Sequence, residues 1–343
     1  MNKATILILA ALCWSCANNS PTEKHQRERD NIINVKDRIR EIVTDPVYIG
    51  SNSVCMVIDS FLMIKDYKSP DMILHLFNKN TFRYITSAIP MGQGPGEIVN
   101  IGHIEVIDNQ RRFYVNDHGK QRIFSYDLDS ILANPRHIPE VKMIMDNTIF
   151  PSGYEYINDT LNIGLIIEPI GNSDFSQSVA GWNMTTGTIA KMSYTHPDIK
   201  KKRVAFAASK EHGIYVECYG YYDLISICDF DGNLKYNIYG RHWNKNPTGR
   251  KIGYSESVIF CKDRIVTLYS GKEAFIRSEN GEIKANWPTK IMIFDISGDY
   301  IQTLETGYNI SRFCYDEENN RLILSFDDEI QFGYLNLDGL ISS

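Results

Sequence analysis

The run "HIEVIDNQRRFYVNDHGKQRIFSYD", His103 to Asp127, holds three strand-like segments separated by polar turns. The segments are HIEVI, RFYVND and RIFSYD, and a Pro-containing spacer leads on to a fourth, HIPEVKMIM. Short runs rich in aromatic and branched apolar residues, bounded by polar turn residues, are typical of β-strands. The stretch therefore predicts a four-stranded antiparallel meander.

The same pattern recurs along the chain. Strand-like runs comparable to RFYVND begin at Phe61, Arg112, Thr160, Gly213, Arg264 and Arg321, close to a fifty-residue period. A meander of this length cannot bury both faces alone, and six in tandem predict a six-bladed β-propeller with four-stranded antiparallel blades. The sixth unit lacks a convincing fourth strand. We therefore expect Asn31 to Val35, "NIINV", to supply its outer strand and close the ring, giving one propeller domain over residues 31–343.

Composition excludes some classes of protein and partner. The chain has 343 residues, 43% hydrophobic and 23% charged, with a formal net charge of −6. This acidic balance disfavours nucleic acid, and the run "KKKR" at residues 200–203 is interpreted as a solvated loop. Cysteines beyond the N-terminus lie in apolar strands, as expected of buried thiols, and the sequence has no paired-Cys, HExxH or calcium-loop motif. We expect no metal and no cofactor.

The N-terminus has the pattern of an export signal. Lys3 precedes the apolar run "ATILILAALCW", which is too short to span a bilayer as a helix. With Cys16 following, residues 1–15 resemble a bacterial lipoprotein signal, which implies an acylated Cys16 and a flexible tether over residues 16–30. Plain secretion is the alternative. The expected location is the cell envelope, periplasmic or associated with the outer membrane, with the lipid as the only membrane contact.

The stretch "MGQGPGEI", Met91 to Ile98, is interpreted as a preset reversal between two blades. Gly92, Gly94 and Gly96 permit unusual backbone angles, and Pro95 fixes its own φ. A phosphate-binding loop would continue with Lys and Ser or Thr into a helix, and neither is present here.

These residues also carry a family resemblance. Gly92 to Asp129 resembles the NHL-type propeller repeat, and the GxGPGE form of the linker looks like that of the TolB-like six-bladed propeller lipoproteins of Bacteroidetes. The positions that match the repeat are Asp108, Val115, Asp117, Arg122 and Ile123. The resemblance implies a propeller fold and an envelope location, and says little about activity.

The connections between units point to one functional face. In a propeller, the linkers between blades and the loops between second and third strands lie on one face, and here these are the long, mixed loops. Function concentrates on such loops. The binding candidates on this face are Glu97, His118, Tyr221, Tyr222, Arg241, His242 and Trp243, with Trp287 and His196 as second choices.

Each candidate also has a structural interpretation. Glu97 could cap turn amides, and Trp243 and Trp287 could pack beneath their loops. The leading functional hypothesis is a monomeric binding module for a peptide, a glycan or a partner protein. The alternative is a lyase or glycoside hydrolase in which Glu97, Arg241 and His242 act in acid–base catalysis at the channel mouth. A third hypothesis is a structural or interaction module inside an outer-membrane assembly.

Overall fold

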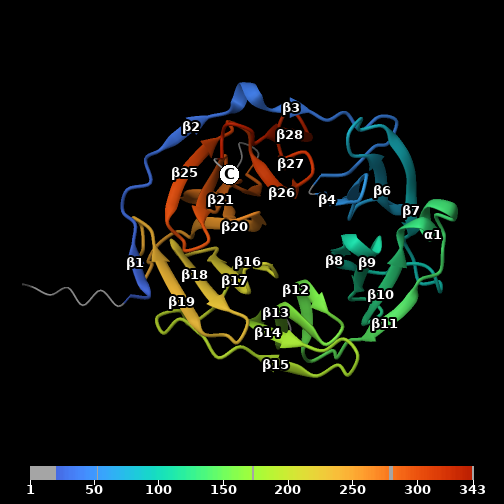
Figure 1. The fold of residues 1–343 in the computed structure, drawn as a ribbon, viewed down its shortest axis with the longest axis horizontal. Helices are drawn as coiled ribbons and strands as arrows, with labels where there is room; N and C mark the ends of the chain where they lie inside the picture. The colour runs from blue at the N-terminus through green and yellow to red at the C-terminus, as the bar shows by residue number, and fades with distance from the viewer. Residues whose placement is uncertain (1–20, 52, 172–173, 278–280, 342–343) are drawn as a thin grey trace, which may run out of the picture.

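A computed structural model describes residues 21–51, 53–171, 174–277 and 281–341. These residues form a closed ring of six four-stranded blades around a central channel, which confirms the predicted six-bladed propeller (Figure 1). The predicted signal peptide and Cys16 lie outside the described residues.

Each blade is an antiparallel meander with its first strand at the channel. Blade one comprises β4 (Val54–Ile58), β5 (Phe61–Lys65), β6 (Met72–Asn78) and β7 (Tyr84–Pro90). Blade two comprises β8 (Ile101–Ile107), β9 (Arg112–Asp117), β10 (Arg122–Asp127) and β11 (Glu140–Ile144). Blade three comprises β12 (Phe150–Asn158), β13 (Leu161–Ile170), β14 (Asp174–Trp182) and β15 (Ile189–Lys191). Blade four comprises β16 (Val204–Ser209), β17 (Ile214–Tyr219), β18 (Leu224–Asp229) and β19 (Leu234–Tyr239). Blade five comprises β20 (Ile252–Cys261), β21 (Arg264–Glu273), β24 (Lys290–Asp295) and β25 (Tyr300–Glu305). Blade six comprises β26 (Ile310–Asp316), β27 (Arg321–Phe326), β28 (Phe332–Asn336) and, from the N-terminal segment, β3 (Arg40–Glu41).

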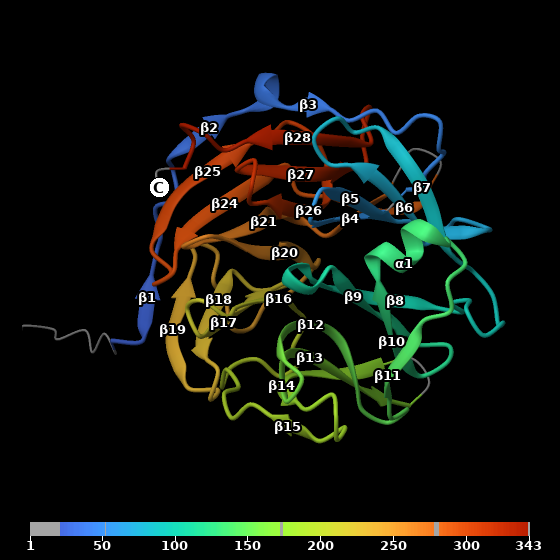
Figure 2. The ribbon, with the colours of Figure 1, turned by 45° about the vertical axis from the view of Figure 1, so that its right-hand side comes forward.

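The N-terminal segment runs around the outside of three blades (Figures 1 and 2). β1 (Glu23–His25) adds a parallel strand to β19, and β2 (Ile32–Asn34) adds one to β25. After the 3₁₀ turn η1 (Lys36–Arg38), β3 pairs antiparallel with β28. This differs from the flexible tether expected over residues 16–30, because the part described from residue 21 on is bound to the fourth blade.

The ring is closed by the N-terminal segment, as predicted, but the expected strand assignment was wrong. Residues Asn31 to Val35 extend the fifth blade, and Arg40–Glu41 completes the sixth. The physical reason is the core: Val35 and Ile39 are buried in the apolar cluster between blades five and six, so the chain must cross that junction before it reaches β28.

Blade-to-blade contacts supply the core. Each pair of neighbouring blades shares a cluster of buried apolar side chains, including the pair that closes the ring, where Ile323 and Phe332 of the last blade pack with Leu62 and Phe77 of the first. Such burial contributes roughly 25 cal/mol per Å² of apolar surface. The result is a rigid scaffold for the loops.

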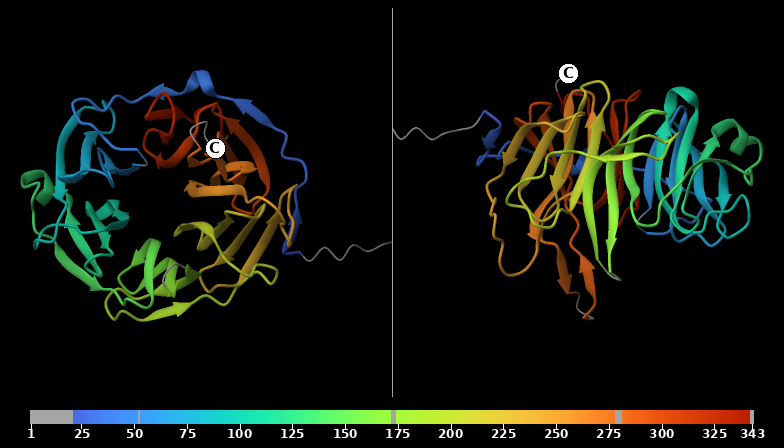
Figure 3. Two further views of the ribbon diagram at one scale, coloured as in Figure 1. Left: turned by 180° about the vertical axis from the view of Figure 1, so that it is seen from behind. Right: turned by 90° about the horizontal axis from the view of Figure 1, so that it is seen from below.

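A short helix, a 3₁₀ turn and a projecting hairpin complete the fold. A six-residue helix, α1 (Leu128–Ala133), follows β10, and Asp127 caps it by accepting hydrogen bonds from the Ser130 amide and hydroxyl. A second 3₁₀ turn, η2, spans Asp108–Gln110. Between β21 and β24, the hairpin of β22 (Phe275–Arg277) and β23 (Ile283–Ala285) projects from the same face of the ring as the extended β13–β14 hairpin (Figure 3). Within the described ranges, no helix has the length and apolar character needed to cross a membrane.

Candidate functional site

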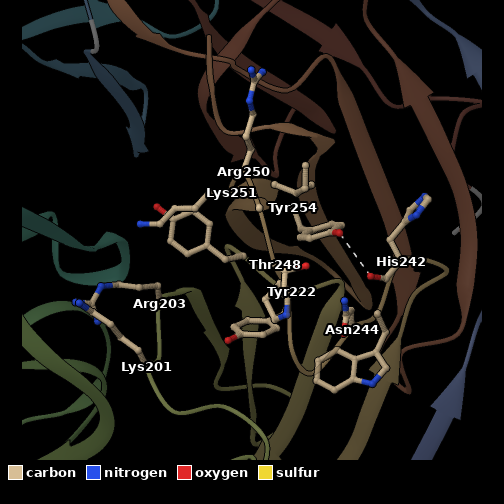
Figure 4. A pocket seen from close by; sticks show the side chains of 14 residues that line it. Lys201, Arg203, Tyr222, His242, Asn244, Thr248, Arg250, Lys251 and Tyr254 are labelled. Atoms are coloured by element: carbon tan, nitrogen blue, oxygen red, sulfur yellow. Dashed lines mark hydrogen bonds between the residues drawn. The ribbon is translucent and has the colours of Figure 1, made fainter.

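A cavity of about 670 Å³ opens on the loop-rich face where blades four and five meet. We call it the linker cavity, because the linker between β19 and β20 forms much of its wall. Its lining consists of Lys201, Arg203, Tyr221, Tyr222, His242, Trp243, Asn244, Pro247, Thr248, Gly249, Arg250, Lys251, Ile252 and Tyr254. In Figure 4, Lys201 and Arg203 lie on one side of the cavity and His242 and Tyr254 on the other.

An aromatic cluster supports the cavity from below. The Trp243 ring lies 4.9 Å from that of Tyr239 and 5.4 Å from that of His196, and it is half-buried. His196 is buried and its Nε2 is 3.0 Å from the Tyr239 hydroxyl, while burial lowers its pKa. Tyr222 contributes a further ring 6.0 Å from Trp243. These contacts fix Trp243 and leave part of its surface available.

Asp223 anchors the start of the linker. Its carboxylate accepts hydrogen bonds from the His242 amide at 3.0 Å and from the Tyr269 hydroxyl at 3.3 Å, and it pairs with Arg29 of the N-terminal segment at 3.0 Å. A Cβ at Gly240 would overlap this carboxylate, so only glycine fits there. The Tyr254 hydroxyl lies 3.5 Å from the His242 carbonyl (Figure 4). The walls near His242 are therefore fixed before any ligand arrives.

The lining is strongly basic. Four side chains that are cationic at neutral pH line the cavity: Lys201, Arg203, Arg250 and Lys251. None of its described lining residues is acidic. Two carboxylates outside the lining pair with three of them. Asp174 lies 2.7 Å from Lys201 and 3.0 Å from Arg203, and Glu273 lies 2.8 Å from Arg250.

These ion pairs leave the cations available to contact a ligand. Lys201 and Arg250 are well exposed, with side-chain exposures of 59% and 81%, and exposed pairs of this kind contribute only about 0–1 kcal/mol. Lys251 Nζ lies 5.0 Å from the centre of the Tyr221 ring, a cation–π contact. Four cations line the cavity and two carboxylates are paired with them, so the lining favours an anionic ligand.

The predicted candidates divide between the cavity and other places. Tyr221, Tyr222, His242 and Trp243 line the cavity. Arg241 is exposed beside it in the chain without lining it, and His196 lies beneath the floor.

Glu97 lies in the linker between β7 and β8, away from this cavity. Its Oε2 accepts a hydrogen bond from the Gly94 amide at 2.7 Å, and Lys120 Nζ donates to the carbonyls of Gly94 and Glu97 at 2.6 and 2.7 Å. The neighbouring Asp117 accepts from the amides of Val99 and Asn100. The glycine-rich stretch thus connects two blades, as interpreted from the sequence, and the Glu97 carboxylate caps its turn.

His118 and Trp287 are also remote from the linker cavity. The His118 ring lies 5.3 Å from that of Phe150, and burial lowers its pKa. Trp287 Nε1 donates to Asp327 at 3.0 Å, between blades five and six. The nine candidates therefore do not converge on one site.

The cations are what sequence reasoning missed. The sequence of residues 200–203 predicts a solvated loop, yet Lys201 and Arg203 line the cavity. The Arg203 guanidinium lies 3.7 Å from the centre of the Phe175 ring. Lys202 instead points to buried Glu217, at 2.6 Å. A basic run beside an expected blade linker was the available signal, but the sequence alone could not show which linker it would face.

A separate group of ionisable side chains lies on the inner strands of blades two and three. His103 Nε2 is 3.0 Å from both Glu105 Oε2 and the Tyr154 carbonyl, and the Tyr156 amide donates to Glu105 at 2.6 Å. Burial raises the pKa of Glu105 to about 8 and lowers that of His103 to about 3. These groups are bound to one another and to the backbone across the blade junction. No set of three His, Cys, Asp or Glu side chains among the described residues is placed to hold a metal ion.

Several solved structures have a similar fold. A member of the DUF4221 family from Bacteroides vulgatus superposes with a TM-score of 0.60 at 10% identity, covering 87% of this chain and 95% of that one. A candidate exported protein from Bacteroides fragilis gives a TM-score of 0.53 at 11% identity, covering 92% and 98%. Regucalcin, a calcium-binding protein from Agrobacterium tumefaciens, gives 0.51 at 9% identity, covering 92% and 95%. At these identities the likeness concerns the fold alone.

Sequence comparison identifies the family. A search of curated proteins gave no match. The model of the family described as TolB-like 6-blade propeller-like matches residues 35–318, most of the ring. The chain belongs to this TolB-like six-bladed propeller family.

Proposed function

We propose that the protein is a non-catalytic binding module that holds an anionic saccharide in the linker cavity. The observation that carries this proposal is the lining itself: four cations and four aromatic side chains, with no acidic residue among the described lining residues of a chain whose net charge is −6. Such a local reversal of charge attracts and orients anions.

The aromatic side chains favour a sugar over an acidic peptide. Tyr and Trp present a rigid apolar face together with a polar tip, which suits the C–H face and hydroxyls of a pyranose ring. The rings of Trp243 and Tyr222 lie 6.0 Å apart on the floor. Arg250 and Lys251, at the end of the β19–β20 linker, line the same cavity. Charge-assisted hydrogen bonds from Lys or Arg to a carboxylate are about twice as strong as neutral ones. A uronate, a sugar that carries a carboxylate, matches both features.

The location we propose is the bacterial cell envelope, with Cys16 lipidated and the propeller attached through the segment that precedes β1. The support is the signal-like sequence of residues 1–15 and the similar fold of a candidate exported Bacteroides fragilis protein. Fractionation of cells expressing the wild type and Cys16→Ser tests this. A wild-type protein that stays in the cytoplasm, or a variant that remains in the membrane fraction, would contradict it.

Calorimetric titration of the purified protein tests the ligand class. Three probes suffice: a uronate disaccharide, a neutral disaccharide of the same ring size, and an Asp-containing dipeptide. We expect binding of the uronate alone, weakened about tenfold by Lys251→Met, as for loss of a hydrogen bond to a charged group. Trp243→Leu should weaken it as well.

Two matched variants control for folding. Lys245→Met removes an exposed lysine from the same linker without touching the lining, and Trp287→Leu removes a half-buried tryptophan elsewhere; both should leave the affinity unchanged. Tight binding of the neutral sugar or the dipeptide would refute the anionic-saccharide assignment. Recovery of a cleaved uronate after incubation would instead support the lyase alternative.

A further inference from the structure

A smaller cavity adjoins the linker cavity on the side of the central channel. Its volume is about 180 Å³, and it shares two wall residues, Arg203 and Tyr221, with the linker cavity. Its lining consists of Gln177, Arg203, Val204, Ala205, Gly220, Tyr221, Ser255 and Glu256. Since β16 and β20 are the innermost strands of their blades, Ala205 and Glu256 place this inner cavity at the channel.

Arg203 separates the two cavities and is held firmly. Its guanidinium donates to the Lys202 carbonyl at 2.6 Å and to the Phe175 carbonyl at 2.9 Å, in addition to the ion pair with Asp174. It also stacks on the Phe175 ring. Because Asp174 and Phe175 belong to blade three and Arg203 directly precedes the first strand of blade four, these contacts fix Arg203 at the boundary between the two spaces.

The inner cavity differs from the linker cavity in charge. Glu256 is exposed to this space, and its carboxylate has no hydrogen bond or ion pair within the described part of the chain. Gln177 Oε1 accepts a hydrogen bond from the Val204 amide at 2.9 Å, which fixes the amide orientation and leaves its NH₂ group available to donate. Among its described lining residues, the inner cavity thus has one cation, Arg203, which is already paired with Asp174, and one carboxylate, the unpaired Glu256. It offers an acceptor and a donor without the excess of positive charge that the linker cavity has.

We propose that the inner cavity is a second subsite, which takes a neutral, hydroxyl-bearing sugar unit next to the anionic unit in the linker cavity. This rests on the proposed function. The ligand class is then a mixed oligosaccharide in which uronate and neutral units adjoin.

The chemistry of hydroxyl groups fits this subsite. A sugar hydroxyl both donates and accepts, so adjacent hydroxyls donate to the Glu256 carboxylate and accept from the Gln177 amide. The inner cavity has a volume of about 180 Å³, about that of six water molecules in the liquid. This volume suits one sugar unit rather than a long segment of an oligosaccharide.

Titration with three probes tests the proposal: a uronate monosaccharide, a uronate linked to a neutral hexose, and a uronate–uronate disaccharide. In the wild type, we expect the mixed disaccharide to bind about tenfold more tightly than the monosaccharide, and the all-uronate disaccharide to show no such gain. Glu256→Gln keeps the size of the side chain and removes its charge. It should let the all-uronate disaccharide gain affinity while leaving the monosaccharide unchanged.

Glu329→Gln, an exposed glutamate on the β27–β28 loop of the sixth blade, is the matched control and should change nothing. If the monosaccharide and both disaccharides fail to bind, the proposed function fails. If the monosaccharide binds but both disaccharides match it in affinity, or Glu256→Gln has no effect on the disaccharide preference, the second subsite alone is refuted.

Discussion

The ion pair between Arg29 and Asp223 should respond asymmetrically to mutation. Both side chains are buried, with exposures of 8% and 3%, and their closest atoms are 3.0 Å apart. We expect Asp223→Asn to destabilise the protein more than Arg29→Met, although each change breaks the same pair.

The reason lies in the other partners of each group. Without Arg29, the Asp223 carboxylate still accepts from the His242 amide and the Tyr269 hydroxyl. Arg29 has no second carboxylate, and its Nε and Nη2 are buried without a partner in the described part of the chain. Removing one member of a buried pair costs about 3–5 kcal/mol when it leaves an uncompensated charge, whereas an apolar replacement of the pair can be almost neutral. We expect about 3–5 kcal/mol for Asp223→Asn and less than about 2 kcal/mol for Arg29→Met.

Thermal and urea unfolding of the two single variants and the double variant measure this. In a chain of this size, each kcal/mol of destabilisation lowers Tm by about 2 °C. Asp223→Asn should therefore lower Tm by about 6–10 °C, and adding Arg29→Met should restore much of that loss. Asp299→Asn, at the exposed pair with Lys24, is the control and should cost about 1 kcal/mol or less. Equal losses in the two single variants, or strict additivity in the double variant, would refute the reasoning.

Three further predictions concern the N-terminal segment, the inner strands and the glycine-rich linker. Deletion through Glu41 should lower Tm far more than deletion through Asp30, because only the longer deletion removes β3 and the buried Val35; similar losses in unfolding experiments would contradict this. Burial raises the pKa of Glu105 to about 8 from an ordinary value near 4.5, so its contribution to stability is complete below about pH 4.5 and is lost as the pH rises toward 8. Glu105→Gln should therefore gain stability relative to the wild type across that range in urea unfolding, and a pH-independent difference would count against it. Glu97→Ala should cost about 1 kcal/mol by freeing the Gly94 amide, with calorimetry showing unchanged uronate affinity.

The repeated units were predictable because each blade repeats the same local pattern. Alternating apolar residues and polar turns specify the strands, and a fifty-residue period specifies the ring. The edge strands were harder. Glu23–His25 and Arg40–Glu41 are short and charged, and they form strands only because β19 and β28 present free edges to them. The helix Leu128–Ala133 was missed because its six residues are too few to show a 3.6-residue period.

The site was predictable only in part, for a related reason. The aromatic and His residues of the β19–β20 linker stood out as unusual residues in a long loop, and they do line the cavity. Lys201 and Arg203 lie some forty residues earlier, and only the packing of blade four against blade five brings them to the same space. Glu97 is a candidate binding residue in the sequence because it is a carboxylate in a glycine-rich loop. In the structure its carboxylate accepts a hydrogen bond from the Gly94 amide of the same loop.

Blade four differs from three other blades in which linker a carboxylate holds. In three blades a carboxylate at or just after the end of the second strand accepts backbone amides of the linker that enters the same blade. The pairs are Asp66 with Gly50, Asp117 with Val99 and Asn100, and Asp328 with Asn309. In blade four the corresponding Asp223 accepts from His242, in the linker that leaves the blade. The outgoing linker, which carries Trp243, is therefore fixed at the floor of the cavity. The Gly220 amide donates to the Arg203 carbonyl and holds the incoming linker, whose cations Lys201 and Arg203 line the other side. The cavity lies between these two linkers, and Asp223 fixes the start of the outgoing one.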